Sequence, residues 1–247
     1  MLARRNVLWL AIAQALMLLA VCSVGPVPAQ YGSGLEVAVP AFYYKNGMLF
    51  FGAKCCVVRW GGRAVLLAPL HTFCQVDTSG RIISCAKQSE INDRIDHAEL
   101  VDFSYRQKVD DLGKSLLKQD IPYGSRSASM PGDMVAFDIS ANSHMRMFNL
   151  SATIAPVGTP VWVLSHDLRS AATGIDRYAG VVSQSSPISL AVKLTQDAPE
   201  GSSGSPIIDS RNELVGMLVE VAVGNRKLVF AIPCTAMTSR LSQEIGR

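Results

Sequence analysis

The sequence contains no block of basic residues: its net charge is only +3, and the lysines and arginines are spread along the chain. Nucleic-acid-binding proteins usually gather such residues on one face or in one segment, so no nucleic acid is expected as a partner. There is also no Cys-x-x-Cys pair and no cluster of histidines, which argues against a metal site. Internal repeats and low-complexity tracts are absent as well. These absences leave an ordinary globular protein as the expectation.

The chain is rich instead in apolar residues, glycine and proline. Hydrophobic residues make up 49% of the 247 positions, and many form short Val/Ile/Leu runs interrupted by 19 glycines and 12 prolines. Short apolar runs between turn residues are typical of β-strands rather than helices. The length is sufficient for one all-β domain or two subdomains with a sizeable core. We therefore predict an all-β fold.

The N-terminal segment is predicted to be a targeting sequence. Two arginines precede an almost uninterrupted apolar stretch, Val7–Val24, and small residues follow it up to Ala29. This is the arrangement of a secretory signal peptide that is cut after Ala29. Residues 1–29 are thus predicted to be a signal peptide and residues 30–247 a secreted or periplasmic domain. The apolar stretch is also long enough for an uncleaved membrane anchor, the one way in which we expect a membrane to be involved.

The cysteines are expected to include a disulfide, because the leader directs the chain out of the cytoplasm. Loss of the leader would remove Cys22 and leave an odd number, so at least one cysteine stays free or pairs between chains. Cys74 could pair with Cys85 in a short loop, or with Cys55 or Cys56 across a hairpin. The fifth remaining cysteine is Cys234. Sequence alone does not choose between these pairings.

A glycine-rich segment, Gly201–Pro206, contains the candidate nucleophile Ser203. A serine nucleophile needs a sharp backbone turn that presents its hydroxyl and lets nearby N–H groups converge on one point, and flanking glycines permit this. The alternative is an ordinary Ser/Gly loop between strands. The rest of the chain has to decide between the two.

A candidate general base follows a predicted β-hairpin. Two apolar runs, Lys54–Trp60 and Arg63–Ala68, are joined by Gly61-Gly62, which suits a tight two-residue turn. The second run leads directly into His71, so this imidazole would lie where a buried strand ends. A surface histidine in a loop is the alternative. The other histidines, which have no comparable setting, are His97, His144 and His166.

The third candidate is a carboxylate that would orient the imidazole. Asp133 follows Pro-Gly and leads the apolar strand Met134–Phe137, where an acid is costly to bury unless another group hydrogen-bonds it. Asp102 is the alternative, but no turn precedes it and its strand is weaker. We therefore select Asp133.

The chain resembles the trypsin-like, chymotrypsin-fold serine peptidases in the order of its candidates, His71, Asp133 and Ser203, and in the Gly-x-Ser-Gly-x-Pro motif at the serine. It is most similar to the compact bacterial members, which include the HtrA-type enzymes. The usual Thr-Ala-Ala-His is Ala-Pro-Leu-His here. The stretches that carry the resemblance are Gly52–Phe73, Asp133–Phe137, Pro156–Leu164 and Leu214–Met217. The match covers about Phe42–Met237. The segment between His71 and Asp133 is long for a compact member. We therefore interpret Gln75–Ser129 as an insertion, with a hairpin around Ala98–Arg106 and a short helix at Lys108–Lys118.

The resemblance implies two six-stranded antiparallel β-barrels, at about residues 35–139 and 148–235, with the active site in the cleft between them. It also implies a serine endopeptidase that forms an acyl-enzyme on Ser203, with the N–H groups of Gly201 and Ser203 as the oxyanion hole and no metal or cofactor. The expected partner is a polypeptide substrate. Asp197 is a candidate substrate-binding residue, because an acid at its distance from the nucleophile selects basic side chains in trypsin. A solvated loop acid is the alternative for Asp197.

Two other functions are compatible with the same residues. One is a catalytically inactive binding module on the trypsin fold, which the altered residues before His71 keep open. The other is a membrane-anchored viral polyprotein protease of the sobemovirus type, which also has a hydrophobic leader and this serine motif. The small-residue site at Ala29 favours a cleaved, exported enzyme.

Overall fold

The computed structural model describes residues 35–76, 82–120, 130–167 and 174–246. All of them belong to one compact unit. The predicted leader, with Val7–Val24, Cys22 and Ala29, lies outside the described residues. No helix within these ranges is long and apolar enough to cross a membrane.

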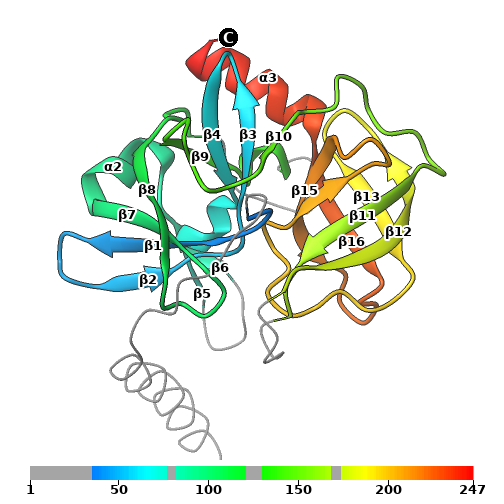
Figure 1. The fold of residues 1–247 in the computed structure, drawn as a ribbon, viewed down its shortest axis with the longest axis horizontal. Helices are drawn as coiled ribbons and strands as arrows, with labels where there is room; N and C mark the ends of the chain where they lie inside the picture. Colours follow the sequence, from blue (N-terminus) through cyan, green and yellow to red (C-terminus); the bar gives the residue numbers. More distant parts are fainter. Residues whose placement is uncertain (1–34, 77–81, 121–129, 168–173, 247) are drawn as a thin grey trace, which may run out of the picture. The chain divides into compact units, whose positions relative to one another are not determined.

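The second half of the chain is a closed antiparallel barrel with the strand order β11-β12-β13-β16-β15-β14 (Figure 1). Pairing of Trp162 with Ile208 and of Val163 with Ile207 closes it. The interior is filled by aliphatic side chains from alternate strand positions, as the period of two requires. The strands are β11 (Pro160–Ser165), β12 (Asp176–Ser185), β13 (Leu190–Leu194), β14 (Pro206–Ile208), β15 (Leu214–Val221) and β16 (Leu228–Pro233).

The first half is an eight-stranded sheet with the order β10-β3-β4-β9-β8-β7-β1-β2. Its ends meet through a bridge between Ala38 and Cys55, whose amide hydrogen bonds measure 3.4 and 3.0 Å. Six strands thus curl into a barrel, and β10 and β2 extend it at its two ends. The strands are β1 (Val39–Tyr44), β2 (Leu49–Phe51), β3 (Cys56–Trp60), β4 (Arg63–Ala68), β7 (Ile95–Val101), β8 (Lys108–Ser115), β9 (Val135–Ile139) and β10 (Met147–Phe148). The predicted all-β, two-barrel class is confirmed.

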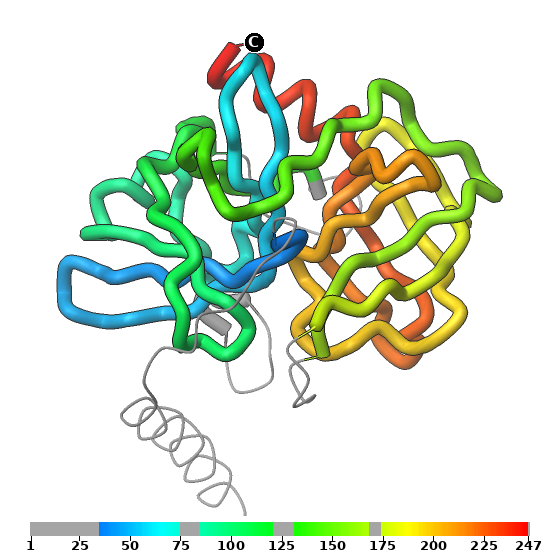
Figure 2. The backbone as a smooth tube through the Cα atoms, viewed as in Figure 1, coloured from blue at the N-terminus to red at the C-terminus, as the bar shows by residue number. Residues whose placement is uncertain are grey.

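Short elements and one longer helix complete the fold. The C-terminal helix α3 leaves the second barrel and returns to the first half beside the β3–β4 hairpin (Figure 2). The remaining elements are η2 (Leu70–Phe73), β5 (Cys74–Val76), β6 (Ile82–Cys85), η3 (Gln88–Glu90), α2 (Ile91–Arg94), η4 (Met130–Gly132) and α3 (Cys234–Ile245).

The hairpin predicted around Ala98–Arg106 is present, because β7 and β8 pair antiparallel on either side of a short turn. The helix predicted at Lys108–Lys118 is wrong, and so is the interpretation of the whole segment as an insertion. Lys108–Ser115 is strand β8, which pairs with β7 on one side and with β9 on the other. Gly113 in β8 lies so close to β9 that a Cβ there would be 2.9 Å from the Cβ of Asp138. The segment between His71 and Asp133 therefore supplies two integral strands of the first sheet. β8 buries only part of its length, so its sequence lacks the apolar pattern of a core strand.

The predicted hairpin at Gly61-Gly62 is confirmed. Trp60 pairs with Arg63, so the two glycines form a two-residue turn, with φ values of +53° and +78°. Positive φ at both central positions is what the tight hairpin turn requires and what glycine permits.

Strands β4 and β9 are buried on both faces. In β4, Ala64, Leu66 and Ala68 pack inside the first sheet. Val65 and Leu67 point the other way, into a cluster that also contains residues of the second barrel and of α3. Strand β9 is divided in the same way: Val135, Phe137 and Ile139 pack inside the first sheet, and Met134 and Ala136 pack into the shared cluster. Both strands are thereby fixed from two sides, which explains their continuous apolar sequence.

The structure pairs Cys74 with Cys85 and leaves Cys55, Cys56 and Cys234 as free, buried thiols. The disulfide joins β5 to β6 directly after His71. Burial raises the pKa of all three thiols, that of Cys56 to about 12. A buried thiol that stays protonated is a poor nucleophile, so these cysteines act as core residues.

We expect a thiol reagent such as DTNB to titrate no cysteine in the folded mature protein at pH 8. After denaturation without a reductant, three thiols should react, and two more should appear after reduction, because only Cys74 and Cys85 are bonded. A retained leader would add the thiol of Cys22. Fewer than three thiols after denaturation would contradict the pairing.

Candidate active site

Strand pairing brings the candidate histidine and acid to the same place. β4 and β9 run antiparallel, with Ala68 opposite Val135, so the end of β4 lies beside the start of β9. His71 follows the first strand by one short turn and Asp133 precedes the second. Because both strands are buried on two faces, both side chains are attached to rigid backbone.

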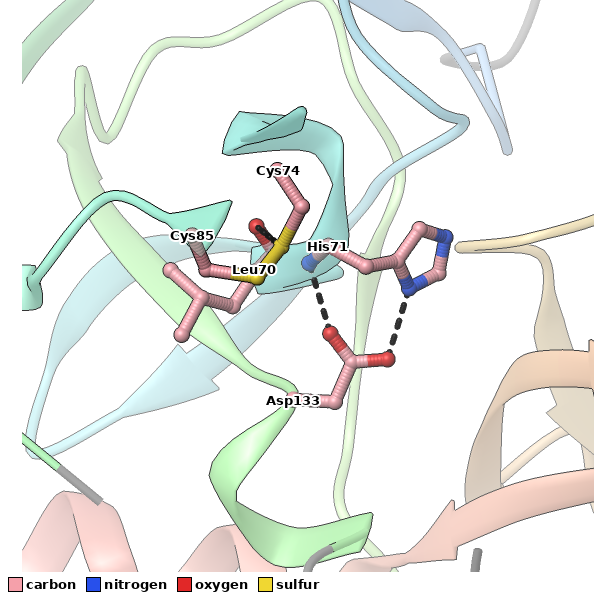
Figure 3. The surroundings of a disulfide bond; sticks show 5 residues. All are labelled: Leu70, His71, Cys74, Cys85 and Asp133. Carbon is pink, nitrogen blue, oxygen red and sulfur yellow. Dashed lines mark hydrogen bonds and ion pairs between the residues drawn. A yellow bond between two sulfur atoms is a disulfide. The ribbon is translucent and has the colours of Figure 1, made fainter. Parts of the chain in front are cut away.

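Both oxygens of the Asp133 carboxylate contact His71 (Figure 3). Oδ1 accepts the backbone N–H of His71 at 2.7 Å, and Oδ2 lies 2.6 Å from Nδ1 of the ring. Asp133 is 3% exposed, and these two donors satisfy a carboxylate that burial separates from water. A proton on Nδ1 that faces the carboxylate leaves Nε2 with a free lone pair, which is the tautomer that a general base needs.

The loop that carries Ser203 docks on the segment before β3. The amide of Lys54 donates to the carbonyl of Ser203 at 2.9 Å. Gly204, with φ +85°, packs so tightly here that a Cβ would lie 1.6 Å from the carbonyl oxygen of Lys54. Only glycine fits at such an approach. The glycine after the candidate nucleophile is therefore required by the contact between the two halves.

The Ser203 hydroxyl has two possible acceptors. Its Oγ lies 2.8 Å from Nε2 of His71 and 2.9 Å from the carbonyl oxygen of Val219. One hydroxyl hydrogen can serve only one of them at a time. When Nε2 is unprotonated, donation to His71 prepares the transfer of that proton to the ring. In the described part of the chain, the N–H groups of Gly201 and Ser203 have no protein acceptor.

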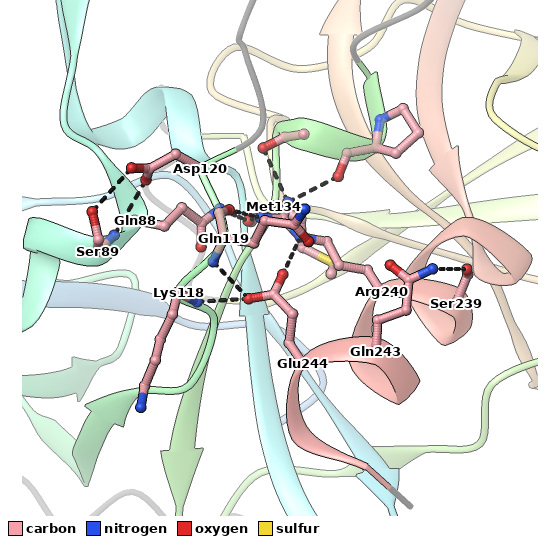
Figure 4. A network of polar contacts seen from close by, with 12 residues as sticks. Gln88, Ser89, Lys118, Gln119, Asp120, Met134, Ser239, Arg240, Gln243 and Glu244 are labelled. Carbon is pink, nitrogen blue, oxygen red and sulfur yellow. Dashed lines mark hydrogen bonds and ion pairs between the residues drawn. The ribbon is translucent and has the colours of Figure 1, made fainter.

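Arg240 of α3 holds the turn before Asp133 (Figure 4). Its Nη1 donates to the carbonyls of Pro131, Gly132 and Met134 at 3.0, 3.2 and 3.1 Å. Nη2 donates to the carbonyl of Gln119 at 3.2 Å, and Nε pairs with Glu244 at 3.0 Å. The arginine is 3% exposed, and this many acceptors is what a buried guanidinium needs. Three of these carbonyls flank the candidate acid, so α3 fixes its backbone.

A cavity of about 300 Å³ opens beside Ser203. Much of its wall is apolar, from Leu218, Val219 and Val221, and Arg226 with Glu200 lies among its polar residues. The Arg226 guanidinium donates to the carbonyl of Ala198 at 2.6 Å and pairs with Glu200 at 3.5 Å. The cavity can therefore receive an uncharged side chain next to the serine.

The two acids that the sequence left uncertain lie elsewhere. Asp197 is exposed and lines an adjoining cavity of about 500 Å³, together with Asp167 and Tyr178. This cavity shares Pro199, Glu200 and Arg226 with the one beside Ser203, but Asp197 does not line the latter. Asp102 accepts hydrogen bonds from the amide and hydroxyl of Ser104 at 3.1 and 2.6 Å, within the turn between β7 and β8. His71, Asp133 and Ser203 are thus brought together, and Asp102 and Asp197 are not part of that group.

Two residues at the site were not identified from the sequence. Lys54 was counted within an apolar-rich run, and the charge in that run was the only available signal. Arg240 forms an i,i+4 pair with Glu244, a spacing that usually indicates a solvent-exposed helix face. The pair is internal because α3 packs against η4 and against the Lys118–Gln119 segment, whose two amides donate to Glu244.

Comparison with known proteins places this arrangement in a recognised fold. No family model and no curated protein matches the sequence. Among solved structures, the Rv3671c protease from M. tuberculosis in its active form is similar at 10% identity and TM-score 0.54, over 92% of this chain and 96% of that one. A serine endoprotease from Yersinia pestis is similar at 14% identity and TM-score 0.55, over 90% of this chain and 68% of that one. The chain therefore has the chymotrypsin-like serine protease fold.

We expect Arg240→Met to lower the free energy of unfolding by about 3–5 kcal/mol, because it leaves the buried Glu244 carboxylate without its cation and several carbonyls without a donor. The matched control is Arg63→Met, which breaks the pair of Arg63 with Asp138, whose side chains are both 48% exposed. Surface pairs contribute about 1 kcal/mol or less. Urea denaturation followed by circular dichroism measures both. Equal losses in the two variants would contradict a structural role for the buried network.

Proposed function

We propose that the chain is a serine endopeptidase that hydrolyses peptide bonds of a polypeptide through an acyl-enzyme. The observation that carries this proposal is the continuous series of contacts from the Ser203 hydroxyl to His71, at 2.8 Å, and from His71 to Asp133, at 2.6 Å. A serine is a weak nucleophile until an adjacent base takes its proton, and a base is effective only when a third group fixes its tautomer. The contacts of Ser203 with His71 and of His71 with Asp133 support both conditions.

In the proposed reaction, Ser203 Oγ attacks the scissile carbonyl carbon while Nε2 of His71 accepts the hydroxyl proton. Asp133 stabilises the resulting imidazolium through the contact with Nδ1. Collapse of the tetrahedral intermediate breaks the peptide bond, and His71 gives its proton to the leaving amine. A water molecule, activated by His71 in the same way, then hydrolyses the acyl-enzyme and regenerates Ser203. No metal or cofactor takes part in these steps.

The N–H groups of Gly201 and Ser203 are proposed to bind the oxyanion of the intermediate. Both lie in the same loop as the nucleophile, and the described residues offer them no other acceptor. Donors that are fixed before the reaction stabilise the developing charge without reorganisation, and losing one typically lowers turnover about a hundredfold or more.

The cavity beside Ser203 supports a preference for apolar side chains in the substrate. Leu218, Val219 and Val221 contribute its apolar wall. Asp197 lies outside it, so we do not assign a preference for basic side chains. Burying a charged side chain against such a wall without a partner would be unfavourable.

A fluorophosphonate probe, which phosphonylates activated serines, tests the proposed chemistry. We expect the wild type to be labelled at Ser203 and Ser203→Ala to be unlabelled. Asp133→Asn should slow labelling about 10³–10⁴-fold, because the imidazole loses the acceptor that fixes its tautomer. Asp102→Asn is the matched control and should react at the wild-type rate. A folded wild type that stays unlabelled from pH 6 to pH 9 would favour an inactive binding module instead.

We also propose that the chain is exported and that its leader is removed. The support is the predicted signal peptide together with the Cys74–Cys85 disulfide, a bond that persists in oxidising compartments. N-terminal sequencing of the protein purified from its native host should begin at Gln30. A start at the initiator methionine would indicate an anchored form, and the viral-type alternative would then gain weight.

A further inference from the structure

Lys54 is a buried cation for which the proposed catalytic steps have no use. The residue is 1% exposed, although lysine is among the residues least often buried completely. Its Nζ donates to the carbonyl of Gly201 at 2.6 Å. Its backbone amide donates to the carbonyl of Ser203 at 2.9 Å. Both ends of one residue thus bind the loop that carries the candidate nucleophile and the candidate oxyanion donors.

These two contacts fix alternate peptide units of the loop. Each peptide unit is planar, so holding its carbonyl also sets the direction of its N–H. Lys54 Nζ holds the unit between Gly201 and Ser202, and the Lys54 amide holds the unit between Ser203 and Gly204. The candidate donors belong to the peptide units that precede Gly201 and Ser203. The N–H of Ser203 is therefore enclosed between two fixed units, and the N–H of Gly201 directly adjoins one.

Most of the other hydrogen bonds of this loop join two residues of the loop or join the loop to the second barrel. The Ser202 hydroxyl donates to the carbonyl of Pro199, and the Ser205 amide donates to the carbonyl of Ser202 at 3.0 Å. Gly204 donates to the carbonyl of Leu218 in β15 at 2.7 Å. Among the described residues, only Lys54 Nζ donates to the Gly201 carbonyl. The first half of the fold therefore acts on this peptide through a single side chain.

Burial of the ammonium has a cost that must be offset by what it binds. Desolvation lowers the pKa of Lys54 from 10.5 to about 8, and the negative charge of Asp167 opposes part of this shift. The ammonium form still predominates at neutral pH. A charge-assisted hydrogen bond to a carbonyl is stronger than a neutral one, so the protonated side chain is a firm anchor for the loop.

We propose that Lys54 is a positioning residue for the oxyanion hole: its ammonium holds the Gly201–Ser202 peptide so that the N–H groups of Gly201 and Ser203 are fixed before substrate binds. This inference rests on the proposed function. In addition to the proposed catalytic residues, a buried cation of the first half of the fold would thus fix the oxyanion donors in the second half.

The test compares Lys54→Met, which keeps the length of the side chain but removes its donor and charge, with the wild type. We expect the second-order rate constant for fluorophosphonate labelling to fall about tenfold to a hundredfold. With a fluorogenic peptide that the wild type cleaves, kcat should fall by the same factor, while KM changes less than about threefold. Lys54→Arg, which keeps the charge and a donor, should recover part of kcat.

The matched control is Lys193→Met, at an exposed position on β13 of the second barrel, which should leave both rates unchanged. Thermal melting establishes that each variant is folded. A folded Lys54→Met that reacts at the wild-type rate would overturn the inference and leave the proposed function intact. A wild type that is itself unlabelled would instead count against the proposed function.

A measurement on the wild type covers the case in which Lys54→Met does not fold. Glu200-Gly201 is the sole Glu-Gly pair in the sequence, so combined ¹³C-carbonyl glutamate and ¹⁵N-glycine labelling isolates the Gly201 amide by NMR. If Lys54 fixes the loop in advance, this amide gives one sharp signal without any inhibitor. A signal that is broadened or doubled, and sharpens only when a peptide boronic acid binds, would overturn the inference.

Discussion

The two-sided burial of β4 and β9 is the constraint on which the rest of the site depends. Each strand contributes one face to the interior of the first sheet and the other to the cluster shared with the second barrel and α3. A strand held in this way cannot shift its register without exposing one of its two apolar sets. His71 and Asp133 extend directly from these strands, so their contact is set by packing rather than by the flexible ends of loops.

The nucleophile comes from the other half, and its position depends on a backbone contact. The loop around Ser203 reaches the first half where Gly204 fits against the Lys54 carbonyl and the Lys54 amide meets the Ser203 carbonyl. Main-chain contacts of this kind vary little, because they depend on few rotatable bonds. The distance between Ser203 and His71 therefore depends on how the two halves pack against each other. A change at that interface should alter this distance under conditions in which both barrels are still folded.

Two buried cations flank the site and are accommodated in different ways. Arg240 has hydrogen-bond acceptors for every one of its nitrogens, among them backbone carbonyls on both sides of Asp133. The Lys54 ammonium donates to the Gly201 carbonyl, and desolvation lowers its pKa. A guanidinium can bind several carbonyls at fixed angles, whereas an ammonium is a compact charge whose protonation responds to burial. The guanidinium of Arg240 therefore suits a structural role, and the ammonium of Lys54 suits a single contact with the loop that carries Ser203.

The all-β class, the turn at Gly61-Gly62 and the candidates His71, Asp133 and Ser203 could be predicted from the sequence. Each leaves a local signal: apolar runs, a glycine pair, or a reactive group next to a buried strand. Four features become evident only in the folded chain: Lys108–Ser115 is a strand, Cys74 pairs with Cys85, Asp197 lies outside the cavity at Ser203, and Lys54 and Arg240 are buried. These features depend on which distant segments of the chain pack together, and the local sequence does not indicate that packing.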